Sequence, residues 1–157
     1  MSSGPSSEIA GPRVASRTIA APARDVFDAW ITPALVEDWW GPEGFSVKVH
    51  RLNAVAGGSF AFEMISPSGA SCIMSGVYKT VEKPERLVFE VHEHCNLDLP
   101  DNTAPQTSHS VVTVAFDEYN GTTTVTISHS QLNEDYGLLA AASWSQSLDK
   151  LCRELRR

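Results

Sequence analysis

The stretch VVTVAFDEYNGTTTVTISHS, residues 111–130, decides the fold of this chain. Two runs that alternate apolar and polar residues flank Asn120-Gly121, the pair most typical of a two-residue β-hairpin turn. This turn fixes the register, which places Val112 opposite His129 on the apolar face of the hairpin. We therefore expect an antiparallel sheet with one apolar face that the rest of the chain must cover.

Similar alternation occurs upstream of this hairpin, and helical spacing occurs in three places. Strands are expected over 13–20, 45–50, 60–64, 72–81 and 87–94, and short helices over 23–31 and 35–40. After the capping segment 133–135 the chain favours one long helix to its end. The expected inner stripe of this helix is Leu138, Ala141, Trp144 or Ser145, Leu148, Leu151 and Leu155.

These elements predict an α+β fold in which a curved antiparallel sheet wraps around the long C-terminal helix. A chain of 157 residues can form one stable core without disulfides or metals, whereas two separate cores would each be only marginally stable. We expect a disordered tail over residues 1–12, because Ser, Gly and Pro dominate it, and a single domain over 13–157.

Composition excludes some classes of partner. The formal net charge of −7 disfavours nucleic acid, and the chain contains no apolar run long enough to span a membrane. Three cysteines, Cys72, Cys95 and Cys152, form an odd set with no CxxC pair, so no disulfide framework or zinc site is expected and a reducing cytoplasm fits best. A monomer or a homodimer is compatible with the sequence.

A cavity is one possible consequence of this architecture. The run Ala140–Ser143 is small and would face large aromatics, so the layers either draw together or leave space for a ligand. The alternative is an ordinary filled core, since the same aromatics would serve it. The candidate cavity residues are Trp30, Trp39, Trp40, Phe60, Phe62, Met64, Phe89, Val91, Val112, Val114, Ile127, His129, Ala141, Trp144 and Leu148.

Two polar residues are candidates for proton transfer. His129 is placed on the inner face by the hairpin register, and Glu93 shares the parity of the inward Phe89 and Val91. The alternative for His129 is a core histidine hydrogen-bonded to the start of the last helix, with Tyr136 as its partner. The alternative for Glu93 is a carboxylate at a strand end that reaches water.

The sequence gives little sign of a metal or cofactor. His92 and His94 share one face of a strand, with Cys95 nearby, and both histidines are expected to point into solvent. His109 and Asp98 could join them only through the folding of the loop, so this spacing is weak evidence for a metal. The glycine pair Gly57-Gly58 precedes a strand and so lacks the helix N-terminus of a phosphate loop. We therefore expect neither a metal nor a cofactor.

Several motifs in order resemble one known family, that of the activator of heat-shock protein 90 ATPase homologues, within the START-like, Bet v 1-like, SRPBCC superfamily. The resemblance covers about residues 13 to 155 and rests on the segments 21–30, 39–45, 57–60, 76–78, 84–89 and the closing helix 144–155. It implies the helix-grip fold and a hydrophobic cavity between the sheet and the C-terminal helix. The chain departs from relatives at Ser143, where a glycine is often found, and in the longer polar segment 96–108.

Three functions are compatible with this resemblance. The first is binding of a small hydrophobic or aromatic molecule, for carriage, sequestration or sensing. The second is a cyclase-, aromatase- or hydrolase-like enzyme that uses the same cavity, with His129 or Glu93 handling protons. The third is a partner module that activates a chaperone ATPase, which only the family name suggests.

Overall fold

A computed structural model of the chain describes residues 12–97 and 99–155. Within these residues, one seven-stranded antiparallel sheet has the order β1-β7-β6-β5-β4-β3-β2. The strands are β1 Arg13–Ile19, β2 Ser46–Leu52, β3 Ser59–Ile65, β4 Ser71–Glu82, β5 Arg86–Glu93, β6 Ser110–Tyr119 and β7 Thr122–Ser130. The helices are α2 Ala23–Ile31, α3 Pro33–Trp39 and α4 Glu134–Leu155.

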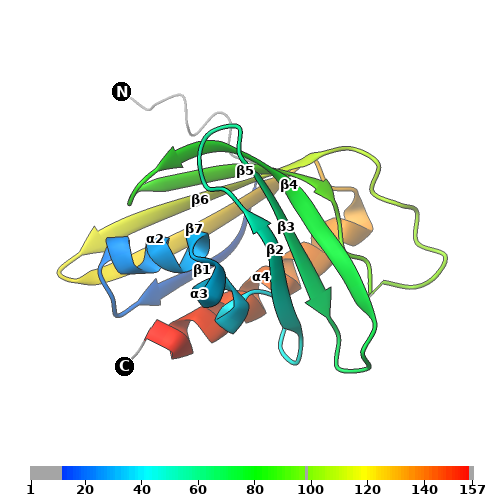
Figure 1. Cartoon of the computed structure of the whole chain (residues 1–157), viewed down its shortest axis with the longest axis horizontal. Coiled ribbons are helices and arrows are strands. Elements are labelled where there is room, and N and C mark those ends of the chain that lie inside the picture. The colour runs from blue at the N-terminus through cyan, green and yellow to red at the C-terminus, as the bar shows by residue number, and fades with distance from the viewer. Residues whose placement is uncertain (1–11, 98, 156–157) are drawn as a thin grey trace.

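The sheet curls around α4, which runs along its hollow side (Figure 1). The short helices α2 and α3 cover the same side near the C-terminal half of α4. This arrangement confirms the predicted α+β helix-grip architecture, with a curved antiparallel sheet around a long C-terminal helix. The expected tail, residues 1–12, lies outside the described residues except for Pro12. The division into a tail and one domain therefore stays a prediction.

The β6–β7 hairpin has the register that its turn predicts. Val112 pairs with His129, and Tyr119 pairs with Thr122 across the turn. Asn120 and Gly121 have φ angles of 54° and 75°, the left-handed conformation that a type I′ turn requires and that these two residue types tolerate best. The hairpin therefore positions His129 on the inner face, as expected.

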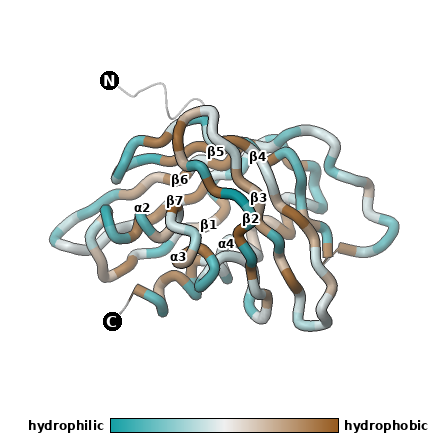
Figure 2. The backbone as a smooth tube through the Cα atoms, in the orientation of Figure 1, coloured by the Kyte–Doolittle hydropathy of each residue, from teal (hydrophilic) through white to brown (hydrophobic). Residues whose placement is uncertain are grey.

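The core lies between the sheet and the helices. Along the strands apolar and polar residues alternate (Figure 2), and the inward set is almost completely shielded from solvent. The largest fully buried side chains come from both layers: Phe60, Phe62 and Phe89 from the strands, and Phe27, Trp30 and Trp39 from α2 and α3. Burial of side chains of this size stabilises a fold by about 2–3 kcal/mol each.

Local signals explain where the short helices begin. Pro22 is the N-cap of α2, and Pro33 occupies the first turn of α3, where its missing N–H costs nothing. The backbone N–H of Ala23 donates to Oε1 of Glu118 at 2.8 Å, which satisfies one free donor of the first turn of α2. The break between α2 and α3 thus falls at Thr32-Pro33, in the gap between the expected helices 23–31 and 35–40.

The inner face of α4 differs from the expected stripe. Leu138 is 69% exposed, whereas Tyr136, Trp144, Ser147 and Leu151 are buried. The buried face starts at Tyr136, and Leu138 lies two residues, or about 200°, further around the helix. Placing Leu138 in the stripe was therefore wrong.

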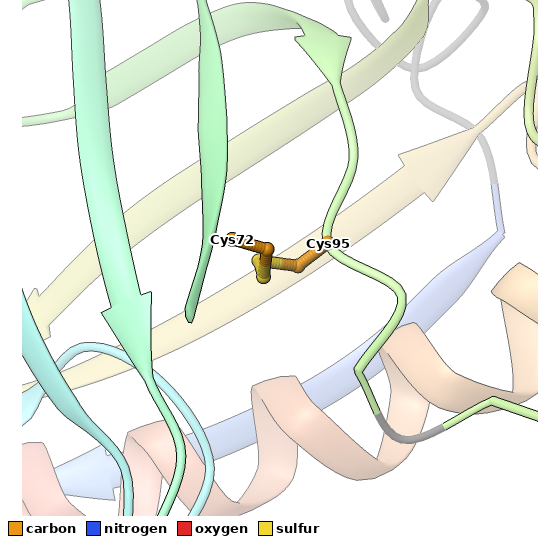
Figure 3. The surroundings of a disulfide bond; sticks show 2 residues. All are labelled: Cys72 and Cys95. Atoms are coloured by element: carbon orange, nitrogen blue, oxygen red, sulfur yellow. A yellow bond between two sulfur atoms is a disulfide. The ribbon is translucent and has the colours of Figure 1, made fainter. Parts of the chain in front are cut away.

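Two cysteines form a disulfide, which corrects the expectation that none would form. Cys72 at the start of β4 is bonded to Cys95, which follows β5, and their Cα atoms are 5.5 Å apart (Figure 3). Both residues flank the hairpin that turns at Lys83-Pro84: Cys72 lies ten residues before Glu82, and Cys95 lies nine after Arg86, the pair that closes the hairpin. Antiparallel pairing therefore brings them opposite each other. Counting CxxC motifs missed this relation because it ignored the hairpin register.

No helix among the described residues is both long enough and apolar enough to cross a bilayer.

Candidate ligand pocket

A partly open pocket of about 90 Å³ lies between the first half of α4 and the strands that face it. Most of its wall is apolar, and histidine, serine and tyrosine side chains supply the polar positions. The lining residues are Trp40, Gly41, Met64, Met74, Val91, His94, Cys95, His129, Leu132, Tyr136, Leu139, Ala140, Ser143, Trp144 and Ser147.

The sequence-predicted cavity residues divide into two groups in the structure. Trp40, Met64, Val91, His129 and Trp144 line this pocket. The others lie outside its wall: Trp30, Trp39, Phe60, Phe62, Phe89, Val112, Val114, Ile127 and Leu148 are buried in the core, and Ala141 is half-buried on α4. Which of them contact a ligand stays a prediction.

Aromatic packing fills the space where a larger cavity was expected. Trp30 stacks on Trp144 with ring centroids 5.7 Å apart, and Trp40 meets the edge of Phe62 at 4.9 Å. A gap among Trp30, Trp40, Phe60 and their neighbours has no room for a water molecule. The usable space is therefore confined to the end of the sheet near the start of α4.

One wall of the pocket is held in place by α4 through polar contacts to the segment after α3. The Lys150 ammonium lies 3.3–3.4 Å from four carbonyl oxygens, those of Trp40, Gly41, Pro42 and Phe45, which share its three N–H donors. The backbone N–H of Gly41 donates to Oγ of Ser147 at 3.1 Å. These bonds fix Trp40 and Gly41 against the helix.

A buried hydrogen-bonded chain forms the polar side of the pocket. Trp144 Nε1 donates to His129 Nδ1 at 3.1 Å, and His129 Nε2 lies 2.9 Å from Oγ of Ser110. The same hydroxyl lies 2.6 Å from Nε2 of His94. His129 is thus a buried histidine, but its partners are Trp144 and Ser110, so naming Tyr136 as its partner was wrong.

The donors and acceptors of this chain have a defined direction. Indole Nε1–H can only donate, so His129 Nδ1 must accept and the ring proton of neutral His129 must reside on Nε2. His129 then donates to Ser110, whose single hydroxyl proton is left for His94 Nε2. The proton of neutral His94 is consequently on Nδ1, which is buried and has no hydrogen-bond partner among the described residues.

Burial keeps both histidines uncharged near neutral pH. Burial, together with a smaller contribution from the nearby His94, lowers the pKa of His129 to about 3. Burial likewise lowers the pKa of His94 to about 4, with contributions from His109 and His92. A protonated His129 would carry a hydrogen on Nδ1 that points at the N–H of Trp144. The hydrogen-bond geometry therefore also disfavours a positive charge on His129.

A β-bulge explains why His94 and Glu93 are not where the sequence places them. Ser75 pairs with Glu93, but the adjacent Gly76 pairs with Val91, so His92 is an extra residue in β5. The bulge reverses the parity beyond it. Glu93 therefore points outward, where it accepts from Oγ of Ser75 at 2.6 Å, and the expectation that it faces inward was wrong.

The same bulge turns His94 into the pocket wall, although it was expected to face solvent beside His92. Gly76 permits the close approach of the strands here, because a Cβ at this position would lie 1.7 Å from the carbonyl oxygen of Glu90. Sequence reasoning also missed Ser110, which is fully buried in the chain. Ser110 is the first residue of β6 and shares the parity of the inward Val112 and Val114, which was a usable signal.

The fold and this pocket define a helix-grip protein of the Bet v 1-like class. More particularly, the chain belongs to the family described as Activator of Hsp90 ATPase homolog 1-like protein, whose model matches residues 20–156. No match was found among curated proteins.

Solved structures of bacterial proteins share the fold. A protein of Chromobacterium violaceum, CV1439, has a TM-score of 0.78 and 21% identity, with 93% of this chain and 97% of that chain covered. The AHSA1 protein SPO3351 of Silicibacter pomeroyi has a TM-score of 0.73 and 26% identity, covering 92% and 96%. An AHSA1-like protein of Aeromonas hydrophila has a TM-score of 0.69 and 22% identity, covering 90% and 91%.

Proposed function

We propose that this protein binds a small apolar or aromatic molecule in the pocket beside α4, and so carries, sequesters or senses it. The observation that carries the proposal is an apolar recess in an otherwise tightly packed interior, with a fixed polar chain on one side. Protein interiors normally leave few voids larger than water, so such a recess needs a reason.

The size of the pocket limits the occupant. At about 90 Å³ it is smaller than a typical drug-sized site of roughly 300–1,000 Å³. It suits one ring or a short alkyl group, and a larger ligand would extend through the open side. Because the wall is mainly apolar, the enclosed part of the ligand should be apolar too.

An enzymatic role has less support. Both ring nitrogens of His129 are engaged by protein partners, and Glu93 lies on the outer face, so neither proposed proton handler is free to act on a pocket ligand. The chaperone-partner role rests on the family description alone. Cytoplasmic location stays a prediction, and the Cys72–Cys95 bond removes its support from cysteine usage.

Thermal unfolding with small aromatic probes tests the proposal. Phenol, indole and acetophenone are suitable, because each can place a six-membered aromatic ring in the pocket and direct the rest of the molecule through the open side. A ligand at 100 times its Kd stabilises the folded state by about 2.7 kcal/mol, a shift of roughly 5–10 °C for a chain of this length.

Two matched variants on α4 make the test specific to the pocket. Ala140→Phe adds a ring to the pocket wall, whereas Ala142→Phe adds the same ring at an exposed position of the same helix. The shift should disappear in Ala140→Phe and persist in Ala142→Phe. An equal shift in both variants, or no shift with any apolar probe, would rule out binding at this site.

A further inference from the structure

A second cluster of chemically active side chains lies on the outer face of the sheet, outside the pocket wall. Glu90 and His92 come from β5, and His109 immediately precedes β6. One ligand atom from each of the three lies within 4.8 Å of the others. The strands β5 and β6 run side by side at this point (Figure 1).

The sheet register explains why the three residues meet. Val91 pairs with Ser110, so His92 and His109 are the next residues on the two strands and lie across from each other. Glu90 is two residues before His92 and opposite in parity to the buried Phe89 and Val91, which places it on the same outer face. His92 follows the inward Val91, so ordinary alternation places its imidazole on the outside.

The distances suit a small divalent ion. His92 Nε2 lies 3.0 Å from Oε1 of Glu90, and the imidazoles of His92 and His109 stack with centroids 3.8 Å apart. Ligands about 2.0–2.1 Å from a tetrahedral ion are separated by about 3.3 Å, so the present spacing needs only small adjustments. The stacked rings must turn about χ2 to aim both nitrogens at one ion, which the exposure of both residues allows.

The charge at the cluster also favours a cation. Glu90 supplies the acidic ligand of the three, and its Oε1 is the oxygen that lies next to the ring of His92. Lys79 lies nearer to the other oxygen, with 3.9 Å between Nζ and Oε2. An ion at Oε1 would replace the hydrogen bond with His92 and leave Lys79 in place.

We propose that Glu90, His92 and His109 form a binding site for a late first-row divalent transition-metal ion such as Zn²⁺, with water completing the coordination. Two imidazoles and one carboxylate are a ligand set that zinc accepts. The ion would join β5 to β6 where the segment 94–109 leaves the sheet. His94 lies two residues after His92, and Ser110 directly follows His109. The metal would therefore hold together the end of the sheet that carries both of these residues.

Calorimetric titration of the full chain with ZnCl₂, after treatment with a chelator, tests the site. One equivalent should bind in the micromolar range, and each of Glu90→Gln, His92→Gln and His109→Gln should weaken binding by about tenfold or more. The chain offers a matched control in His50, which pairs with Glu63 at 2.8 Å on the surface but has no third potential ligand among the residues that the structure describes. His50→Gln should bind zinc as the unmodified chain does.

NMR of the histidine side chains provides an independent readout. Zinc should shift the ring signals of His92 and His109 and leave those of His50 unchanged. Absence of binding, binding that survives His109→Gln, or loss of binding in His50→Gln would each overturn the proposal. None of these outcomes depends on whether the pocket binds a small molecule.

Discussion

The buried neutral state of His129 predicts how the stability of this protein depends on pH. The pKa of the folded state, about 3, lies below the ordinary value of 6.5. As the pH falls through 6.5, the unfolded chain therefore takes up a proton at His129 that the folded chain refuses. The stability contributed by this group is complete above pH 6.5 and is lost progressively as the pH falls toward 3.

The size of the effect follows from the two pKa values. Between pH 7 and pH 5 the unfolded chain becomes almost fully protonated at His129 while the folded chain does not. One pKa unit corresponds to about 1.4 kcal/mol, so this single residue should lower the free energy of unfolding by about 2 kcal/mol over that interval.

Urea denaturation at pH 7 and pH 5 measures this contribution by comparison with a variant. His129→Gln keeps an acceptor for Trp144 and a donor for Ser110 but cannot titrate, so the unmodified chain should lose about 2 kcal/mol more than the variant does. His50→Gln, altered at an exposed histidine, should retain the pH dependence of the unmodified chain. Equal losses in the unmodified chain and His129→Gln would refute the buried neutral assignment.

Two further predictions concern the strands around the pocket. Reduction of the Cys72–Cys95 bond, which closes a loop of sequence separation 23, should lower the free energy of unfolding by about 3 kcal/mol in urea titrations. A Cys72→Ser/Cys95→Ser chain should show the lower value with or without reductant. An unmodified chain whose stability does not change with reductant would contradict this. Gly76→Ala should destabilise the chain by several kcal/mol, because the new Cβ would collide with the carbonyl of Glu90 and force the strands apart. A melting temperature, measured by circular dichroism, that equals the value for the unmodified chain would show that the two strands are not in close contact here.

The parts of the fold that could be predicted are those that local chemistry determines. Asn120-Gly121 sets the register of one hairpin, and Pro22 and Pro33 mark the starts of two helices. Residues far from these signals, such as His129, can therefore be assigned to the correct face. The bulge at His92 could not be predicted in this way, because the extra residue is accommodated only through contact with Gly76 on another strand. That one residue reverses which of Glu93 and His94 faces inward.

The candidate site was predictable only in part for a related reason. The sequence places Trp40 and Trp144 near a possible cavity, but whether aromatic rings leave space depends on how they pack in three dimensions. In the structure Trp30 fills the middle of the predicted cavity, and the remaining space moves toward Tyr136. The disulfide, in contrast, was within reach, since the hairpin turning at Lys83-Pro84 brings its two cysteines together.

The central claim, that an apolar molecule enters the pocket beside α4, can be tested with methyl labels that the chain already provides. It contains three methionines, and two of them, Met64 and Met74, line the pocket, whereas Met1 lies outside the described residues. In spectra of chain labelled with [methyl-¹³C]methionine, titration with indole or acetophenone should shift the Met64 and Met74 signals in a saturable manner and leave Met1 unchanged. If every such probe leaves Met64 and Met74 unmoved, or shifts all three methyls alike, the pocket does not bind ligands of this class.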